Sequence, residues 1–117
     1  MVTDLLGYEF ADNVVEAFFY DSDAKVIEMY FDYIYEDKTI EKPCKLVISQ
    51  WKDARSKQHD IGVHESLESH LGIISMILDV EIQGNRLVMI INTIDGRYIE
   101  LVFTSPEVKV DFDNLKR

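Results

Sequence analysis

The chain has 117 residues, with 22 Asp and Glu against 12 Lys and Arg, so its formal net charge is −10 at pH 7. This charge opposes phosphate backbones and anionic lipid surfaces, and we expect neither nucleic acid nor membrane as a partner. The length suits one domain, residues 1–117, whose core can form without a metal or a disulfide. Cys44 is the only cysteine, which excludes an internal disulfide and suits a reducing compartment.

The first predicted elements form a β-hairpin. Residues 14–20 are rich in branched and aromatic side chains, which favour a strand, and residues 21–24 supply a turn. Residues 25–35 then alternate between two faces. One face carries only apolar and aromatic side chains, whereas the other is more polar: Ile27, Met29, Phe31, Tyr33 and Tyr35 against Val26, Glu28, Tyr30, Asp32 and Ile34.

The next predicted strand covers residues 44–51 and follows Pro43, which suits the start of a strand or an edge. We interpret Cys44 as a small buried hydrophobic residue and Trp51 as a core residue. Residues 52–63 are the most polar part of the chain, and we expect a long loop there.

Residues 65–71 are the best helix candidate, with two leucines four positions apart and Gly72 placed to end the helix in a left-handed conformation. Residues 73–82 alternate again and predict a strand. One continuous helix over 65–82 is the competing interpretation, and the strict alternation favours the strand.

A second hairpin is predicted from residues 87–94 and 97–104, joined by a two-residue Asp95-Gly96 loop, and a short strand follows at 108–112. That register places one apolar set on the inner face: Val88, Ile90, Ile99, Leu101 and Phe103. It also requires a three-residue loop or a bulge between Gln83 and Leu87. The predicted fold is mainly β (α+β): a single antiparallel meander sheet or a sandwich of about six to seven strands, with one short helix near residues 65–71.

Three histidines are the main candidates for chemistry. The run that begins at His64 resembles the start of a zinc-protease helix, but its fifth position is Glu68 instead of histidine. A metal site or enzyme would use these side chains together with His59 and His70. There is no glycine-rich phosphate loop and no nucleophile-elbow motif. We therefore expect no catalytic residues, no cofactor and no bound metal.

A surface is the stronger candidate for function. The polar side of residues 25–35 and the residues that follow combine carboxylates with a tyrosine: Glu28, Tyr30, Asp32, Glu36 and Asp37. Carboxylates steer and pair with cations, and tyrosine supplies contact area, so this set predicts a docking surface for a basic protein. The alternative is a strand face that contacts only water.

Several short motifs, taken in chain order, resemble those of small acidic bacterial immunity-type proteins of polymorphic toxin systems. They are Gly7-Tyr8, Tyr33-Ile34-Tyr35, residues 44–51, His70-Leu71-Gly72-Ile73 and residues 92–98. The resemblance implies a β-rich cytoplasmic protein that neutralises one toxin. It carries over no functional residue, because the binding surfaces of such proteins vary.

The expected function is that of a non-catalytic protein-binding domain, an immunity-like inhibitor that occludes a basic toxin domain such as a nuclease. The alternative is an accessory or structural domain that forms a homodimer through its apolar edge strands. The N-terminal residues have neither the basic region nor the apolar region of a signal peptide, and we expect a cytoplasmic protein.

Overall fold

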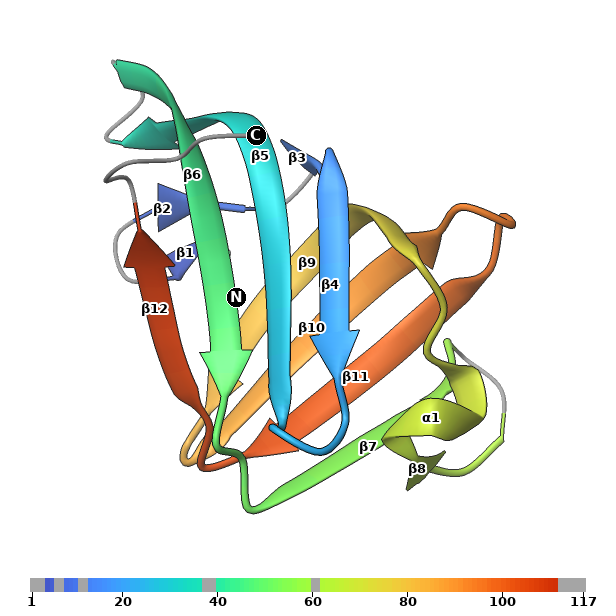
Figure 1. Cartoon of the computed structure of the whole chain (residues 1–117). Helices are drawn as coiled ribbons and strands as arrows, with labels where there is room; N and C mark the ends of the chain where they lie inside the picture. Colours follow the sequence, from blue (N-terminus) through green and yellow to red (C-terminus); the bar gives the residue numbers. More distant parts are fainter. Residues whose placement is uncertain (1–3, 6–7, 11–12, 37–39, 60–61, 112–117) are drawn as a thin grey trace.

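The computed structural model describes residues 4–5, 8–10, 13–36, 40–59 and 62–111, and it describes side chains at 10, 13–31, 43–59 and 62–111. Within these ranges the chain forms two antiparallel sheets of six strands each and one short helix (Figure 1). The prediction of a mainly β fold with one short helix near residues 65–71 is confirmed.

The first sheet is built around two long strands, with β4 and β12 at its sides. It contains β1 (Asp4–Leu5), β2 (Tyr8–Glu9), β4 (Ala17–Asp21), β5 (Val26–Glu36), β6 (Ile40–Ser49) and β12 (Glu107–Asp111). The predicted first hairpin is the β4–β5 pair, in which Phe19 lies opposite Glu28.

The second sheet packs against the first and carries the helix at one edge. In spatial order it contains β3 (Asn13–Val14), β9 (Ile74–Gln83), β10 (Arg86–Thr93), β11 (Tyr98–Thr104), β7 (Asp53–Gln58) and β8 (Glu65–Ser66). The helix α1 (Leu67–His70) follows β8 directly and has four residues.

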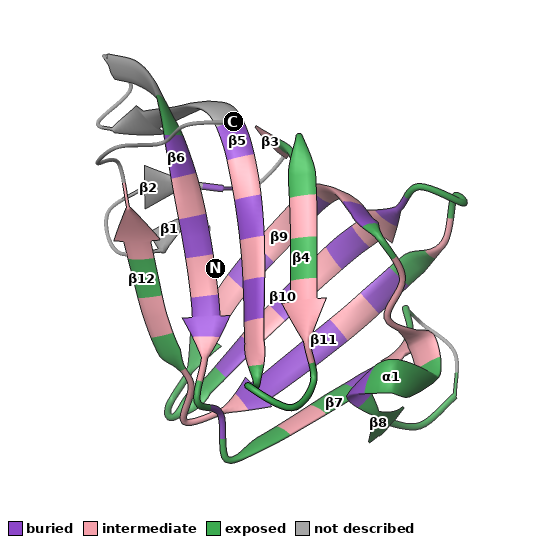
Figure 2. Cartoon of the chain, viewed as in Figure 1, coloured by how far each residue is buried: buried purple, intermediate pink, exposed green. Residues whose placement is uncertain are grey.

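The core lies between the two sheets, and alternate residues along the described parts of β5, β6 and β10 are buried (Figure 2). The inward side chains of β5, Ile27, Met29 and Phe31, are fully buried, as the alternation predicts. The prediction that Cys44 and Trp51 belong to the core is also confirmed, because both are buried.

Besides the changes of sheet on either side of β3, the chain passes from one sheet to the other at two corners on the same side of the molecule (Figure 1). Residues 50–52 carry it from β6 to β7, and residues 105–106 carry it from β11 to β12. Gln50 and Ser105 adopt left-handed conformations there, with φ of 55° and 51°. The Trp51 ring fills the first corner, with its centroid 5.1 Å from that of Phe103.

The predicted loop at 52–63 is wrong over its first half, where the structure has β7. This strand is polar because it lies near the edge of its sheet and little of it faces the core. Its buried position is Ser56, whose hydroxyl lies 2.8 Å from the Ser66 carbonyl oxygen and 3.1 Å from that of Leu67. Hydrogen bonds to the neighbouring segment therefore replace the apolar contacts that sequence periodicity detects.

The predicted register of the β10–β11 hairpin is also wrong by one residue. Its loop has three residues, Ile94-Asp95-Gly96, because the Thr93 N–H donates to the Arg97 carbonyl at 3.0 Å and Gly96 adopts φ +85°. The inward set of β10 is therefore Leu87, Met89 and Ile91, whereas Val88 and Ile90 lie on the outer face.

The error in the loop explains the error in the preceding connection. With Leu87 and Met89 inward, a two-residue Gly84-Asn85 turn brings Val80 opposite Met89 and into the core. The predicted three-residue loop is absent, and the irregularity lies further along β9, where the register shifts between the partners of Ile90 and Ile91.

Gly72 does not end the helix in a left-handed conformation. Its φ is not positive, and the C-cap Leu71 is already extended, with φ −65° and ψ 126°. A Cβ at this position would lie 2.6 Å from Nη2 of Arg97, so a larger residue would displace the end of that side chain.

Candidate protein-interaction surface

The predicted surface residues that the structure describes in full lie on the outer face of the first sheet. Alternation in β5 turns Glu28 and Tyr30 away from the buried Met29, and the register places neighbours from β4, β6 and β12 beside them. The outer face of the first sheet comprises Ala17, Phe19, Asp21, Val26, Glu28, Tyr30, Lys45, Val47, Ser49, Glu107, Lys109 and Asp111.

Glu28, Tyr30 and Lys45 form a hydrogen-bonded group at the centre of this face. The Tyr30 hydroxyl donates to Glu28 Oε1 at 3.0 Å, and Lys45 Nζ lies 3.9 Å from the same oxygen. The ammonium also lies 5.6 Å from the centroid of the Tyr30 ring. Desolvation, followed by the hydrogen bond to Glu28, raises the pKa of Tyr30, so the phenol stays protonated and keeps donating. The centre of the face is therefore closer to neutral than the sequence suggested.

The other predicted surface residues extend from the same strand. Asp32 and Glu36 belong to β5, and their side chains lie outside the described part of the structure; Asp37 lies wholly outside it. The pairing of β5 with β6 shifts its register between Phe31 and Ile34. The structure thus brings Glu28 and Tyr30 together and leaves the placement of the other three side chains as a prediction.

Phe19 is the main residue of this face that sequence reasoning missed. It lies directly opposite Glu28 and is 48 % exposed, which is unusual for a phenylalanine in the middle of a strand. The adjacent pair Phe18-Phe19 was the available signal, because neighbours in a strand point to opposite faces. Only Phe18 packs against the core.

His64 and His70 contact different residues and do not converge on one site. His64 Nε2 lies 2.6 Å from Glu100 Oε2, whereas His70 Nδ1 lies 3.2 Å from Ser56 Oγ. Among the residues that the structure describes, there is no group of three or more His, Cys, Asp or Glu side chains placed to hold a metal ion. His59, whose backbone N–H donates to the Tyr98 carbonyl, sits at the end of β7.

Glu68 instead bridges the two layers through Tyr20. The Tyr20 hydroxyl at the end of β4 donates to Glu68 Oε2 on α1. Burial first, and then the carboxylate, raise the pKa of Tyr20, while the hydrogen bond lowers the pKa of Glu68. A mostly polar cavity of about 240 Å³ lies beside this contact, between α1, the β4–β5 turn and the β6–β7 corner, and includes Lys25 and Lys52 in its lining.

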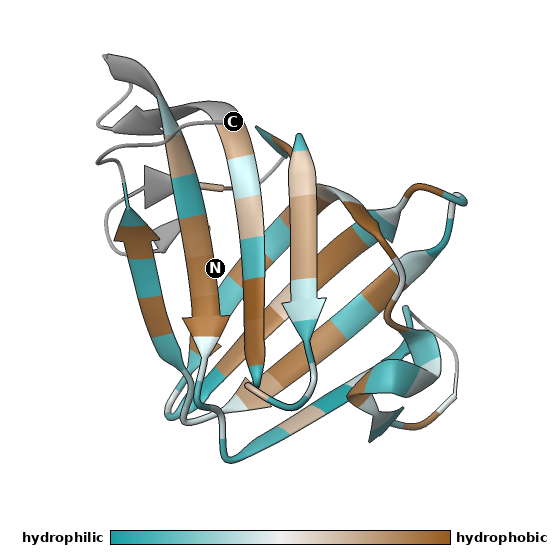
Figure 3. Ribbon diagram, viewed as in Figure 1, coloured by the Kyte–Doolittle hydropathy of each residue, from teal (hydrophilic) through white to brown (hydrophobic). Residues whose placement is uncertain are grey.

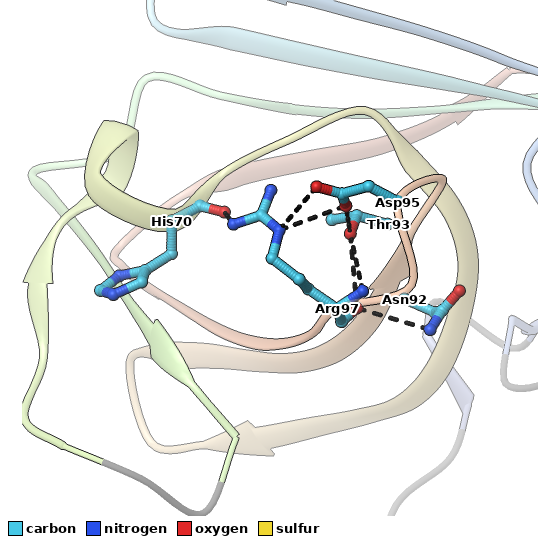
Figure 4. A network of polar contacts seen from close by, with 5 residues as sticks. All are labelled: His70, Asn92, Thr93, Asp95 and Arg97. Carbon is cyan, nitrogen blue, oxygen red and sulfur yellow. Dashed lines mark hydrogen bonds and ion pairs between the residues drawn. The ribbon is translucent and has the colours of Figure 1, made fainter.

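Arg97 joins the β10–β11 loop to the end of α1 (Figure 4). Its Nη1 donates to the His70 carbonyl at 3.1 Å, and its Nε lies 3.0 Å from Asp95 Oδ2. Hydrogen bonds from Thr93 and then Arg97 lower the pKa of Asp95. Cations commonly satisfy the last carbonyls of a helix in this way, and the network fixes the position of α1.

No protein-family model matches the chain, and comparisons with curated proteins and with solved structures find no significant similarity. Among the described residues, no helix combines the length and the apolar character needed to cross a membrane.

Proposed function

We propose that the chain is a non-catalytic protein-binding domain that docks a basic protein on the outer face of the first sheet. The observation that carries this proposal is Phe19, a half-exposed aromatic ring that lies opposite Glu28 and one strand from Tyr30. An exposed aromatic side chain beside a carboxylate offers both an apolar anchor and a partner for arginine.

The Glu28 carboxylate is the point at which a cationic side chain would bind. The carboxylate accepts one hydrogen bond from the Tyr30 hydroxyl and can accept more, and Lys45 Nζ forms only a long ion pair with it at 3.9 Å. An arginine from the partner replaces that contact with a shorter, bidentate one, and Lys45 retains its place over the Tyr30 ring. Glu107 and Asp111 lie on the same face and add negative charge around this contact.

The net charge of −10 supports the same partner class. A strongly negative protein attracts a basic one over about a Debye length and speeds their encounter. In the immunity-like form of the proposal, the partner is a basic toxin such as a nuclease. The carboxylates then occupy the positions of substrate phosphates, and inhibition is by occlusion.

The test is calorimetric titration with the purified product of the neighbouring gene. Phe19→Ala is expected to weaken binding about tenfold or more, and Glu28→Lys to weaken it further by removing the carboxylate and adding repulsion. Ile94→Ala is the matched control, because Ile94 is 66 % exposed and lies on the β10–β11 loop.

Raising the salt concentration should also weaken binding, mainly through slower association. Binding that is unchanged in both Phe19→Ala and Glu28→Lys would remove this face from the proposal. An affinity that is equal at low and high salt would remove its electrostatic part.

A further inference from the structure

The outer face of the second sheet carries more apolar surface than a face in contact with water requires. After Arg86, its central strand β10 continues Leu87-Val88-Met89-Ile90-Ile91, an unbroken apolar run (Figure 3). Such runs are typical of strands covered on both sides, whereas a strand with one wet face alternates with polar residues. The first sheet covers only the side of Leu87, Met89 and Ile91.

The residues on the other side of β10 have apolar neighbours in the adjacent strands. The apolar members of this outer face are Val14, Met76, Val88, Ile90, Tyr98 and Val102. Val14 is 51 % exposed and Tyr98 is 56 % exposed, so both ends of this group are open to solvent. Strands β3, β9 and β11 thus extend the apolar centre to both sides of β10.

Charges of opposite sign border this apolar centre on its two sides. In one ladder row Asp79 on β9 is followed by Ile90, Glu100 and then Lys57 on β7. In the neighbouring row Glu81 on β9 leads through Val88 and Val102 to Arg55 on β7. The β9 side carries the acidic Asp79 and Glu81. The β7 side carries the basic Lys57 and Arg55, and Asp53 on the same face of β7 lies 3.0 Å from Arg55 Nε. About 14 Å separates the two sides over three strand spacings.

We propose that a second copy of this chain covers the outer face of the second sheet in an isologous dimer. A two-fold axis that runs along the strands between β10 and β11 exchanges β9 with β7. It therefore places Asp79 and Glu81 over the partner's Lys57 and Arg55. The same operation exchanges β10 with β11, so Val88 meets the partner's Val102 and Ile90 meets the partner's Glu100. An axis across the strands would instead place acid on acid. The charge pattern of the face thus selects one orientation.

The size of the face makes the dimer weak. Four strands about 4.8 Å apart and four ladder rows about 7 Å apart cover roughly 500 Å² per chain, or about 1,000 Å² in the pair, which is the low end of specific interfaces. The negative net charge of each chain opposes association further. The dimer should therefore form reversibly and at high protein concentration.

Sedimentation velocity from about 10 to about 500 µM at moderate salt tests the proposal, since an interface of this size is expected to populate a dimer within that range. The wild type should shift from monomer to dimer. Lys57→Glu and Asp79→Lys should each weaken self-association about tenfold or more, because each places like charges opposite one another. Lys109→Glu, which makes the same charge change on the first sheet, is the matched control and should dimerise as the wild type does.

Mixing the two variants gives the decisive measurement. Lys57→Glu and Asp79→Lys should form a heterodimer with each other, because both of their cross-interface pairs are then attractive. If net charge alone controlled self-association, Asp79→Lys would self-associate more strongly than the wild type, which is the opposite of the result expected here. A chain that stays monomeric throughout, or a dimer that Lys57→Glu, Asp79→Lys and Ile90→Lys all leave unchanged, would overturn the proposal. Because this face is opposite the one that binds the basic protein, its failure leaves the proposed function standing.

Discussion

Replacing Ser56 with alanine measures how much one buried hydroxyl contributes to the attachment of α1. Ser56 is 0 % exposed, and its hydroxyl lies within hydrogen-bond distance of the carbonyl oxygens of Ser66 and Leu67 and of His70 Nδ1. In the variant the Leu67 carbonyl keeps a second donor, the Leu71 N–H. The Ser66 carbonyl and His70 Nδ1 each lose a hydrogen-bond partner that water does not easily replace. Loss of one buried hydrogen bond costs about 1–2 kcal/mol.

A loss of about 1.5 kcal/mol should lower Tm by about 6 °C for a chain of 117 residues. Urea denaturation and calorimetry measure the change, and Ser49→Ala is the control. Ser49 lies on the outer face of the first sheet, and its hydroxyl makes no hydrogen bond among the described residues. The control should stay within about 0.5 kcal/mol of the wild type. Equal effects of the two substitutions would refute the reasoning, because the buried contacts would then contribute nothing beyond a surface hydroxyl.

Three further predictions concern the register, the bridge between layers and the thiol. Met89→Ala should destabilise the protein by about 2–5 kcal/mol and Val88→Ala by much less, since Met89 is fully buried and Val88 faces outward. Urea denaturation measures both changes, and a larger loss for Val88→Ala would instead support the register with a two-residue hairpin loop. Tyr20→Phe should destabilise the protein at neutral pH, because it removes the hydrogen bond to Glu68. The difference in stability between the two proteins should shrink as pH falls below 4.5, the ordinary pKa of Glu68. A carboxyl with a lowered pKa stabilises the fold while it is ionised and loses that contribution on protonation. Thermal unfolding of both proteins between pH 7 and pH 3 measures this, and a constant difference would contradict it. Cys44, at 0 % exposure, should react with a thiol reagent only as fast as the protein opens, so added urea should accelerate labelling; rapid labelling of the native chain would contradict its burial.

The alternation in β5 correctly predicted the buried positions Ile27, Met29 and Phe31, because that strand is covered on one side only; the side chains of Tyr33 and Tyr35, predicted for the same face, lie outside the described part. Burial on one face selects apolar residues at every second position, and the sequence retains that period. In β10 both neighbouring positions are apolar, so periodicity cannot choose between Val88 and Met89. The choice then depended on the Asp95-Gly96 dipeptide, which suits a two-residue loop and also a three-residue loop with glycine in the left-handed position.

The strand β7 was missed for a different reason. Its inward positions carry small residues, Ala54 and Ser56, and the Ser56 hydroxyl contacts the segment that leads into α1. No hydrophobic period remains for sequence reasoning to detect, and the strand is defined by its pairing with β11. The same limit applies to the candidate surface, where Phe19 and Lys45 join Glu28 only through strand pairing.

The two proposed surfaces have a joint consequence because they lie on opposite sides of the sandwich. If the second sheets of two chains pack together, both first-sheet outer faces point away from the dimer interface, and the dimer offers two separate sites for the basic protein. Each site keeps its own Phe19 and Glu28, so the stoichiometry of the complete assembly is two to two. Binding of the strongly basic partner also reduces the negative charge that opposes dimerisation, so the partner should strengthen self-association. Sedimentation of the chain with and without the partner measures this coupling. The Lys57→Glu variant should bind the partner one to one and should not dimerise when the partner is bound.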